Sequence, residues 1–86
     1  MRQDQIIRYA LATEKSMRLM ESENKLAFIV DKRANKQEIK KAIEEEFSVK
    51  IQNVSTTITP NGKKKAYIQF TEETPAIDVA TKLGLM

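Results

Sequence analysis

The segment NKQEIKKAIEEEFSVKIQNVSTTI, residues 35–58, decides the fold because its apolar residues change from the period of a helix to that of a strand. Ile39, Ile43 and Phe47 recur every four residues, which is the spacing of one apolar helix face. Asn35 and the glutamate three residues later have the spacing of a capping box, in which each side chain accepts a hydrogen bond from the other's backbone amide. The sequence therefore predicts a helix that begins after Asn35 and ends near Phe47.

After this helix the apolar residues alternate, which is the pattern of a strand with one buried face. Val49 and Ile51 share one face, whereas the alternation that ends at Ile58 falls on the other, so we expect a bulge at residues 52–53 to restore the register. The sequence TPNG at residues 59–62 predicts a hairpin turn, because Asn-Gly readily adopts the positive φ that tight connections need.

Two other segments alternate in the same way and are expected to complete the sheet. Residues 65–70 form the return strand, on which Tyr67 is the only aromatic residue expected to face outward, and residues 25–30 form the first strand. Residues 6–11 are apolar except for Arg8 and form only a short segment, so we interpret them as an extended lead-in to the first helix. The predicted sheet therefore has three strands.

Two further helices flank these strands. Thr13 can cap a helix that ends near residues 23–24, and Thr74 can cap a last helix with Pro75 at its first position. The expected core contacts of this last helix are Ile77, Ala80 and Leu83. The element order is α-β-α-β-β-α, in which the third strand can lie between the first two, antiparallel to both. This order predicts an α+β ferredoxin-like plait with a mainly antiparallel three-stranded sheet, helices packed on one face and an open opposite face.

The composition excludes most catalytic and metal-binding chemistry. The chain has no Cys and no His, so thiolate and imidazole metal sites, Cys nucleophiles and His acid–base catalysis are all excluded. Adjacent glutamates at residues 44–46 point in different directions on a helix and cannot act as one paired site. We therefore expect no enzyme activity, no metal and no cofactor.

Length and hydropathy predict a small soluble domain. Residues 1–86 suffice for one domain with a modest core, and the polar residues 1–5 are expected to form a flexible arm. No apolar run approaches the roughly 18 residues of a membrane span. We expect an intracellular protein that is monomeric when isolated and makes no membrane contact.

The charge points instead to an anionic partner. Lys and Arg total 15 against 12 Asp and Glu, which gives a net charge of +3. The cations gather in three segments: the hairpin lysines 63–65, residues 32–40, and the start of the first helix around Lys15. Lys and Arg contacts to phosphate release counterions, and this release dominates nucleic-acid affinity. Two plainer interpretations stay open, because a lysine-rich turn also protects a sheet edge and a charged helix face is often simply solvated.

Six segments in order carry a resemblance to a known family: TEKS at 13–16, NK at 24–25, ANKQEIKKAI at 34–43, FSVKI at 47–51, NVST at 53–56 and KKAYI at 64–68. Together they resemble the universal large-subunit ribosomal protein twenty-three family, over nearly the whole chain from Arg8 to Leu83. The order and spacing of the segments are more specific than any one of them. The α+β fold of that family agrees with the fold predicted above.

The resemblance implies a structural constituent of the large ribosomal subunit, cytoplasmic and ribosome-bound. Its implied partners are large-subunit rRNA, neighbouring ribosomal proteins beside the exit of the nascent-peptide tunnel, and docking factors such as signal recognition particle and a nascent-chain-associated complex. The family's docking motif falls on Ala12, Thr13 and Glu14, with Glu14 as the charged contact for a basic partner. The rRNA contacts are expected at Arg8, Lys15, Arg18, Lys32, Arg33, Lys36, Lys40, Lys63, Lys64 and Lys65.

One departure from the family pattern lies in the hairpin. Bacterial members carry a long basic extension there, whereas residues 60–62 close the hairpin directly in this chain, which therefore looks like the short archaeal form. Two other functions remain alternatives because plaits of this kind host many activities. One is a protein–protein interaction module with a ferredoxin-like fold, and the other is a small-molecule regulatory domain.

Overall fold

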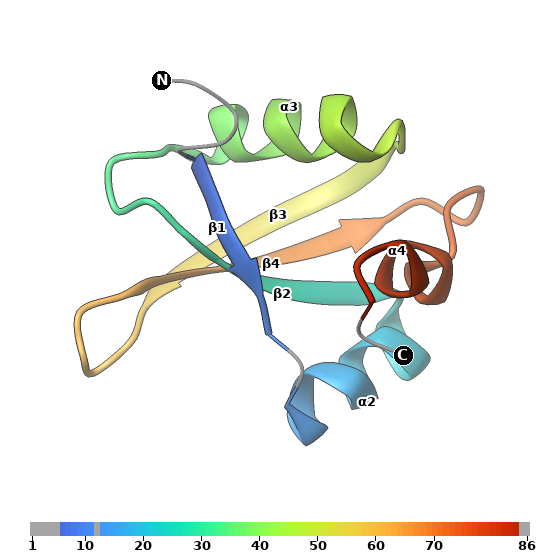
Figure 1. Cartoon of the computed structure of the whole chain (residues 1–86), viewed down its shortest axis with the longest axis horizontal. Helices are drawn as coiled ribbons and strands as arrows, with labels where there is room; N and C mark the ends of the chain where they lie inside the picture. Colours follow the sequence, from blue (N-terminus) through green and yellow to red (C-terminus); the bar gives the residue numbers. More distant parts are fainter. Residues whose placement is uncertain (1–5, 12, 85–86) are drawn as a thin grey trace.

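The computed structural model describes residues 6–11 and 13–84, which form helices packed against a four-stranded sheet (Figure 1). In chain order the elements are β1 (Ile7–Ala10), α2 (Glu14–Glu23), β2 (Lys25–Val30), α3 (Lys36–Phe47), β3 (Ile51–Ile58), β4 (Lys64–Phe70) and α4 (Ala76–Lys82). The predicted flexible arm, residues 1–5, lies outside the described residues. None of the helices within the described ranges is both long enough and apolar enough to span a membrane.

The sheet is antiparallel throughout, with the strand order β1-β2-β4-β3. β4 lies between β2 and β3, antiparallel to both, as the sequence predicts. The expectation of three strands was wrong, because residues 7–10 form a fourth strand at the edge of the sheet beside β2. The register of this strand shifts between Ile7 and Tyr9, and the shift interrupts the alternation by which a strand is recognised in a sequence.

The predicted bulge in β3 is confirmed. The register of β3 with β4 shifts between Ile51 and Asn53, so Ile51 and Val54 both face the core although their spacing is odd. The strand itself begins at Ile51, and Val49 precedes it as a half-buried residue at the edge of the core. Ile58 is 60% exposed. It lies at the hairpin end of the sheet, which projects beyond the helices (Figure 1).

One face of the sheet and the helices α2, α3 and α4 enclose a single apolar core. α3 contributes Ile39 and Ile43, which are fully buried, and it begins with the predicted capping box. In that box Asn35 Oδ1 accepts from the backbone amide of Glu38 at 2.8 Å, and the Glu38 carboxylate accepts from the amide of Asn35 at 3.2 Å. The other large core residues are Ile6, Met20, Leu26, Phe28, Val30, Ile51, Val54, Ile68, Phe70 and Val79.

The start of α4 differs from the prediction. Thr74 does not cap this helix, and Pro75 occupies the N-cap position without a side-chain hydrogen bond. Asn24, the residue that follows α2, supplies the missing acceptor from another part of the fold. Its Oδ1 accepts from the backbone amide of Ala76 at 2.6 Å. A long-range contact thus replaces the local cap.

The buried face of α4 is also rotated relative to the prediction. Ala76, Val79 and Ala80 are buried and Leu83 is half-buried, so the core-facing stripe has a spacing of three, one and three residues. Ile77 lies beside this stripe and is 46% exposed, so its prediction as a core contact was wrong.

Candidate nucleic-acid interface

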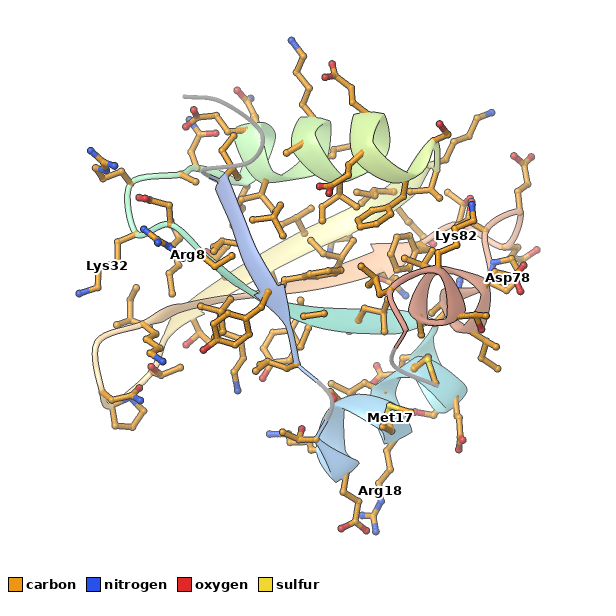
Figure 2. The ribbon with its side chains drawn as sticks, viewed as in Figure 1. Arg8, Met17, Arg18, Lys32, Asp78 and Lys82 are labelled. Carbon is orange, nitrogen blue, oxygen red and sulfur yellow. The ribbon has the colours of Figure 1, made fainter. Side chains whose placement is uncertain are left out.

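A groove at the hairpin end of the sheet gathers cations from three segments of the chain, and we call it the basic groove. β1 contributes Arg8, the loop between β2 and α3 contributes Lys32 and Arg33, and the β3–β4 hairpin contributes Lys63 and Lys64. The groove has a volume of about 540 Å³, and its floor is mainly apolar. Figure 2 shows Arg8 and Lys32 on the same side of the molecule. The fold therefore joins cations that are separate in the sequence.

Contacts between the hairpin and the β2–α3 loop hold this end together. Gly62 has a φ of 82°, a conformation that favours glycine, and a Cβ added there would lie 3.4 Å from Lys32 Nζ. The Lys32 ammonium therefore lies against the hairpin turn. Lys64 is half-buried, and its Nζ donates to the carbonyl oxygen of Ala34 at 2.6 Å. Lys64 thus fastens the loop to β4, whereas Lys32 lies at the surface.

Asp31 arranges the two guanidinium groups of the groove. Its buried carboxylate accepts from Arg8 Nη2 at 3.2 Å, from Arg33 Nε at 3.2 Å and from the backbone amide of Arg33 at 2.8 Å. These bonds from Arg33, with a smaller contribution from Arg8, lower the pKa of Asp31 to about 2. In turn, Asp31 raises the pKa of Arg33. Both guanidinium groups are thereby fixed while their side chains remain 60% and 78% exposed.

Tyr9 brings an aromatic ring to the same groove. It follows the register shift of β1 and pairs with Ile29 of β2 on the open face of the sheet. Its hydroxyl accepts from Lys63 Nζ at 3.1 Å, and the residue is 47% exposed. Tyr67 was predicted to be the only outward aromatic residue of the sheet. That expectation was wrong because Tyr9 lies on a strand that the sequence does not reveal.

Lys15 and Lys65 lie at a second, shallower depression on the open face. Tyr67 and Ala27 also line it, and Lys65 Nζ lies 5.6 Å from the centroid of the Tyr67 ring. The open face of the sheet therefore carries two neighbouring lysine–tyrosine pairs. One of these pairs is in the basic groove, and the other is beside the start of α2.

The remaining predicted rRNA contacts lie on helices outside the groove. Lys36 and Lys40 are exposed on the first turns of α3, which follows directly after the β2–α3 loop. Arg18 lies on α2, apart from Arg8 and Lys32 (Figure 2), and its Nη2 donates to the Glu14 carboxylate at 2.8 Å. Arg18 is thus not brought to the groove.

The predicted docking motif occupies the start of α2. Ala12 lies outside the described residues. Thr13 is confirmed as the N-cap, since its hydroxyl accepts from the amide of Ser16 at 3.2 Å and Ser16 Oγ accepts from the Thr13 amide at 2.9 Å. The Glu14 side chain is 83% exposed and pairs with Arg18 one turn later. Glu14 is therefore the accessible member of the motif, and the Thr13 hydroxyl is engaged in the cap.

The charge of the chain is distributed unevenly. The basic groove holds five cationic side chains and one carboxylate, which leaves ten basic and eleven acidic side chains in the rest of the sequence. At the other end of β4, a groove of about 550 Å³ lies between α2 and α4, and its acidic residues are Glu21, Glu23 and Glu72. In the described ranges, acidic side chains form no group that could hold a metal ion. Positive charge is therefore concentrated at one end of the molecule.

Sequence reasoning missed two residues of the basic groove. Tyr9 carried no signal because β1 was not recognised as a strand. Asp31 did carry one: it stands directly before two cations, and an Asp two residues ahead of a backbone amide is typical of a turn that its own side chain closes.

Comparison with known proteins gives a consistent result. A family model described as ribosomal protein L23 matches residues 5–81. Large ribosomal subunit protein uL23 of Trypanosoma brucei brucei is 53% identical over 81 residues, which cover 94% of this chain and 49% of the trypanosome protein. The uL23 protein of Methanococcus aeolicus is 46% identical over 80 residues, which cover 93% of both chains. The chain thus spans about half the length of the first relative and nearly all of the second.

Proposed function

This chain belongs to the ribosomal protein L23 family, and we propose that its basic groove binds large-subunit rRNA while the start of α2 faces docking factors. Membership of the family makes the chain a structural constituent of the large ribosomal subunit, bound to the ribosome in the cytoplasm, and not an enzyme. The proposal therefore assigns tasks to two separate surfaces of one small domain.

The observation that carries the rRNA assignment is the gathering of five cations around one groove. Each Lys or Arg that contacts a phosphate releases condensed counterions, which is the main source of affinity for nucleic acid. Asp31 holds Arg8 and Arg33 in place beforehand, so less side-chain entropy is lost on binding. Lys36 and Lys40 on α3 extend the cationic surface beyond the groove.

The docking assignment rests on Glu14. Its carboxylate lies at the first turn of α2, away from the basic groove, where it forms an exposed ion pair with Arg18. A binding partner would compete with Arg18 for this carboxylate. Such pairs contribute little, so a basic segment of a partner can replace Arg18 at small cost. We assign this surface to factors that meet nascent chains at the tunnel exit, such as signal recognition particle and a nascent-chain-associated complex. Neighbouring ribosomal proteins are the further partners that we propose.

The rRNA assignment is tested with two double variants that remove equal charge from opposite ends of the molecule. One carries Lys32→Ala and Lys63→Ala in the basic groove, and the other carries Lys50→Ala and Lys82→Ala near α4. Filter binding to large-subunit rRNA across a salt series gives the slope of log affinity against log salt. The groove variant should reduce the magnitude of this slope by about 2, since each lost phosphate contact removes roughly 0.9.

The control variant should keep the wild-type slope and affinity. All four lysines are exposed, so both variants should fold as the wild type does. Equal losses in the two variants would mean that only total charge matters and would remove the groove from the proposal. Absence of rRNA binding by the wild type at low salt would reject the rRNA assignment altogether.

A further inference from the structure

The basic groove combines two kinds of lining, and phosphate needs only one of them. Arg8, Lys32 and Lys63 form a cationic rim, whereas most of the remaining lining is apolar surface, to which the half-exposed Tyr9 contributes and the 6% exposed Ile29 adds little. A phosphate group bound at the rim would leave this apolar surface in contact with water. A better ligand carries a flat, weakly polar group directly beside a negative charge.

The Tyr9 ring is held in a position from which it can stack. The Lys63 ammonium lies 3.1 Å from the hydroxyl oxygen and 5.7 Å from the ring centroid. These two distances place the nitrogen almost in line with the C–O bond, beyond the hydroxyl edge of the ring. The ammonium thus contacts the hydroxyl end of the ring and does not sit above the ring centre, and Tyr9 remains 47% exposed.

The charged rim beside this ring is equally fixed. Asp31 bonds both Arg8 and Arg33, and its two oxygens are occupied by these donors. Its negative charge is therefore balanced within the protein. A ligand that enters the groove meets an aromatic face, a guanidinium plane that can also stack, and the ammonium groups of Lys32 and Lys63.

We propose that the basic groove holds a single unpaired nucleotide of RNA, with its base stacked on Tyr9 and its flanking phosphates at Lys32 and Lys63. This inference rests on the proposed rRNA-binding function and names the part of the RNA that enters the groove. Bases inside an A-form duplex cannot reach such a floor, whereas a bulged or looped-out base can. An acidic peptide would satisfy the cations but has no planar group beside its charges. Stacking tolerates any base, so the site selects for an unpaired nucleotide rather than for a sequence.

The test uses the full chain and two RNA hairpins that differ by one nucleotide. One hairpin is fully paired, and the other carries a single bulged 2-aminopurine, whose fluorescence falls when it stacks on another ring. Wild-type protein should bind the bulged hairpin roughly 5- to 150-fold more tightly than the paired one, which is the effect of stacking one base. Binding should also change the 2-aminopurine fluorescence.

Three variants separate the ring from its surroundings. Tyr9→Ala should remove the preference for the bulged hairpin, whereas Tyr9→Phe, which keeps the ring and loses the bond to Lys63, should retain most of it. Tyr67→Ala is the matched control, because Tyr67 lies on the same open face next to Lys65 but outside the groove, and it should retain the full preference. Circular dichroism checks that each variant is folded.

Two results would overturn the inference. One is an unchanged 2-aminopurine signal when the wild type binds, which is decisive even if the Tyr9→Ala chain does not fold. The other is a preference for the bulged hairpin that survives in folded Tyr9→Ala. In either case the proposed function would still stand if both hairpins bind with a salt slope that Lys32→Ala and Lys63→Ala reduce. Loss of all RNA binding by the wild type would instead reject both proposals.

Discussion

Asn24 connects three parts of the chain through its backbone and its side chain. It ends α2 in the left-handed region, with φ 56° and ψ 40°, and its side-chain nitrogen lies 3.1–3.2 Å from the carbonyl oxygens of Phe70, Thr71 and Thr74. Its side-chain oxygen accepts from Ala76, the first residue of α4. One amide therefore ties the end of α2 to the end of β4 and to the start of α4.

Asn24→Ala should lower the free energy of unfolding by about 2–4 kcal/mol, because it leaves buried backbone groups without partners and because alanine tolerates the left-handed region less well than asparagine does. Asn24→Gly should cost less, since glycine adopts that backbone conformation without strain. Urea unfolding followed by circular dichroism measures both changes. If both variants were as stable as the wild type, the side-chain amide would contribute nothing to stability. If both lost the same amount of stability, the left-handed backbone conformation would carry no strain.

Asp31 makes the stability of the fold depend on pH in an acidic range. Its pKa is lowered to about 2 in the folded chain from an ordinary value of 3.8. The unfolded chain therefore binds this proton first as the pH falls. The stabilising contribution is fully present above pH 4 and is lost as the pH falls from about 4 to about 2.

The prediction concerns the difference between wild type and Asp31→Asn, because other carboxylates titrate in the same range in both proteins. Wild type should be the more stable protein at pH 6, and its advantage should shrink steadily between pH 4 and pH 2. Urea midpoints at several pH values supply the difference. An advantage that is constant over that range would show that the ion pairs to Arg8 and Arg33 do not lower the pKa.

At the scale of elements, α3 and α4 show how far local pattern determines structure. α3 follows its apolar stripe and its capping box, both of which are local, and the prediction of this helix was correct. α4 receives its first hydrogen-bond acceptor from Asn24, far away in the sequence, so the local signal at Thr74 and Pro75 placed the start within one residue but gave the wrong cap. Which face of α4 is buried depends on its packing against the rest of the fold, so the sequence could not show that Ile77 faces solvent.

The candidate site was likewise predicted only in part from the sequence. Its cations were predicted because charge is visible in composition, but their meeting in one groove depends on β1, which pairs only through contacts with β2. Four residues with a register shift give no periodic signal, so Tyr9 was missed together with the strand. The sequence could not show which residues meet through the fold when they are far apart in the chain.

The same substitution, isoleucine to alanine, should have very different effects on stability in α3 and in α4. Ile43→Ala should cost about 2–5 kcal/mol, because Ile43 is fully buried and its loss leaves a cavity in the core. Ile77→Ala, on the exposed flank of α4, should change the free energy of unfolding by about 0.5 kcal/mol or less. Thermal unfolding of both variants provides the comparison. A large loss for Ile77→Ala would mean that this side chain packs against the core after all.

At the scale of the whole molecule, the sheet separates two surfaces of different charge. β4 runs from the basic groove at Lys64 to the acidic groove at Phe70, a distance of roughly 20 Å along the strand. The molecule itself measures 28 × 27 × 21 Å. This separation exceeds the roughly 8 Å screening length of physiological salt, so the charge at each end acts on its own partner.

Two variants should therefore separate the two proposed tasks. Glu14→Lys places a second cation one turn before Arg18 and near the start of α2, which should cost only a few tenths of a kcal/mol in stability. It should leave the affinity for large-subunit rRNA within about twofold of wild type, because Glu14 lies outside the basic groove. It should weaken the binding of signal recognition particle to ribosomes that carry it, which co-sedimentation measures.

The groove variant with Lys32→Ala and Lys63→Ala should show the opposite pattern. Free protein should bind rRNA less tightly and with a shallower salt slope, whereas subunits that do incorporate it should recruit the docking factor at the wild-type level. Parallel losses of both activities in either variant would mean that the two surfaces act as one. A domain of this size can serve two partners only if their contacts do not overlap, and Lys32 lines the basic groove whereas Glu14 lies on α2 outside it.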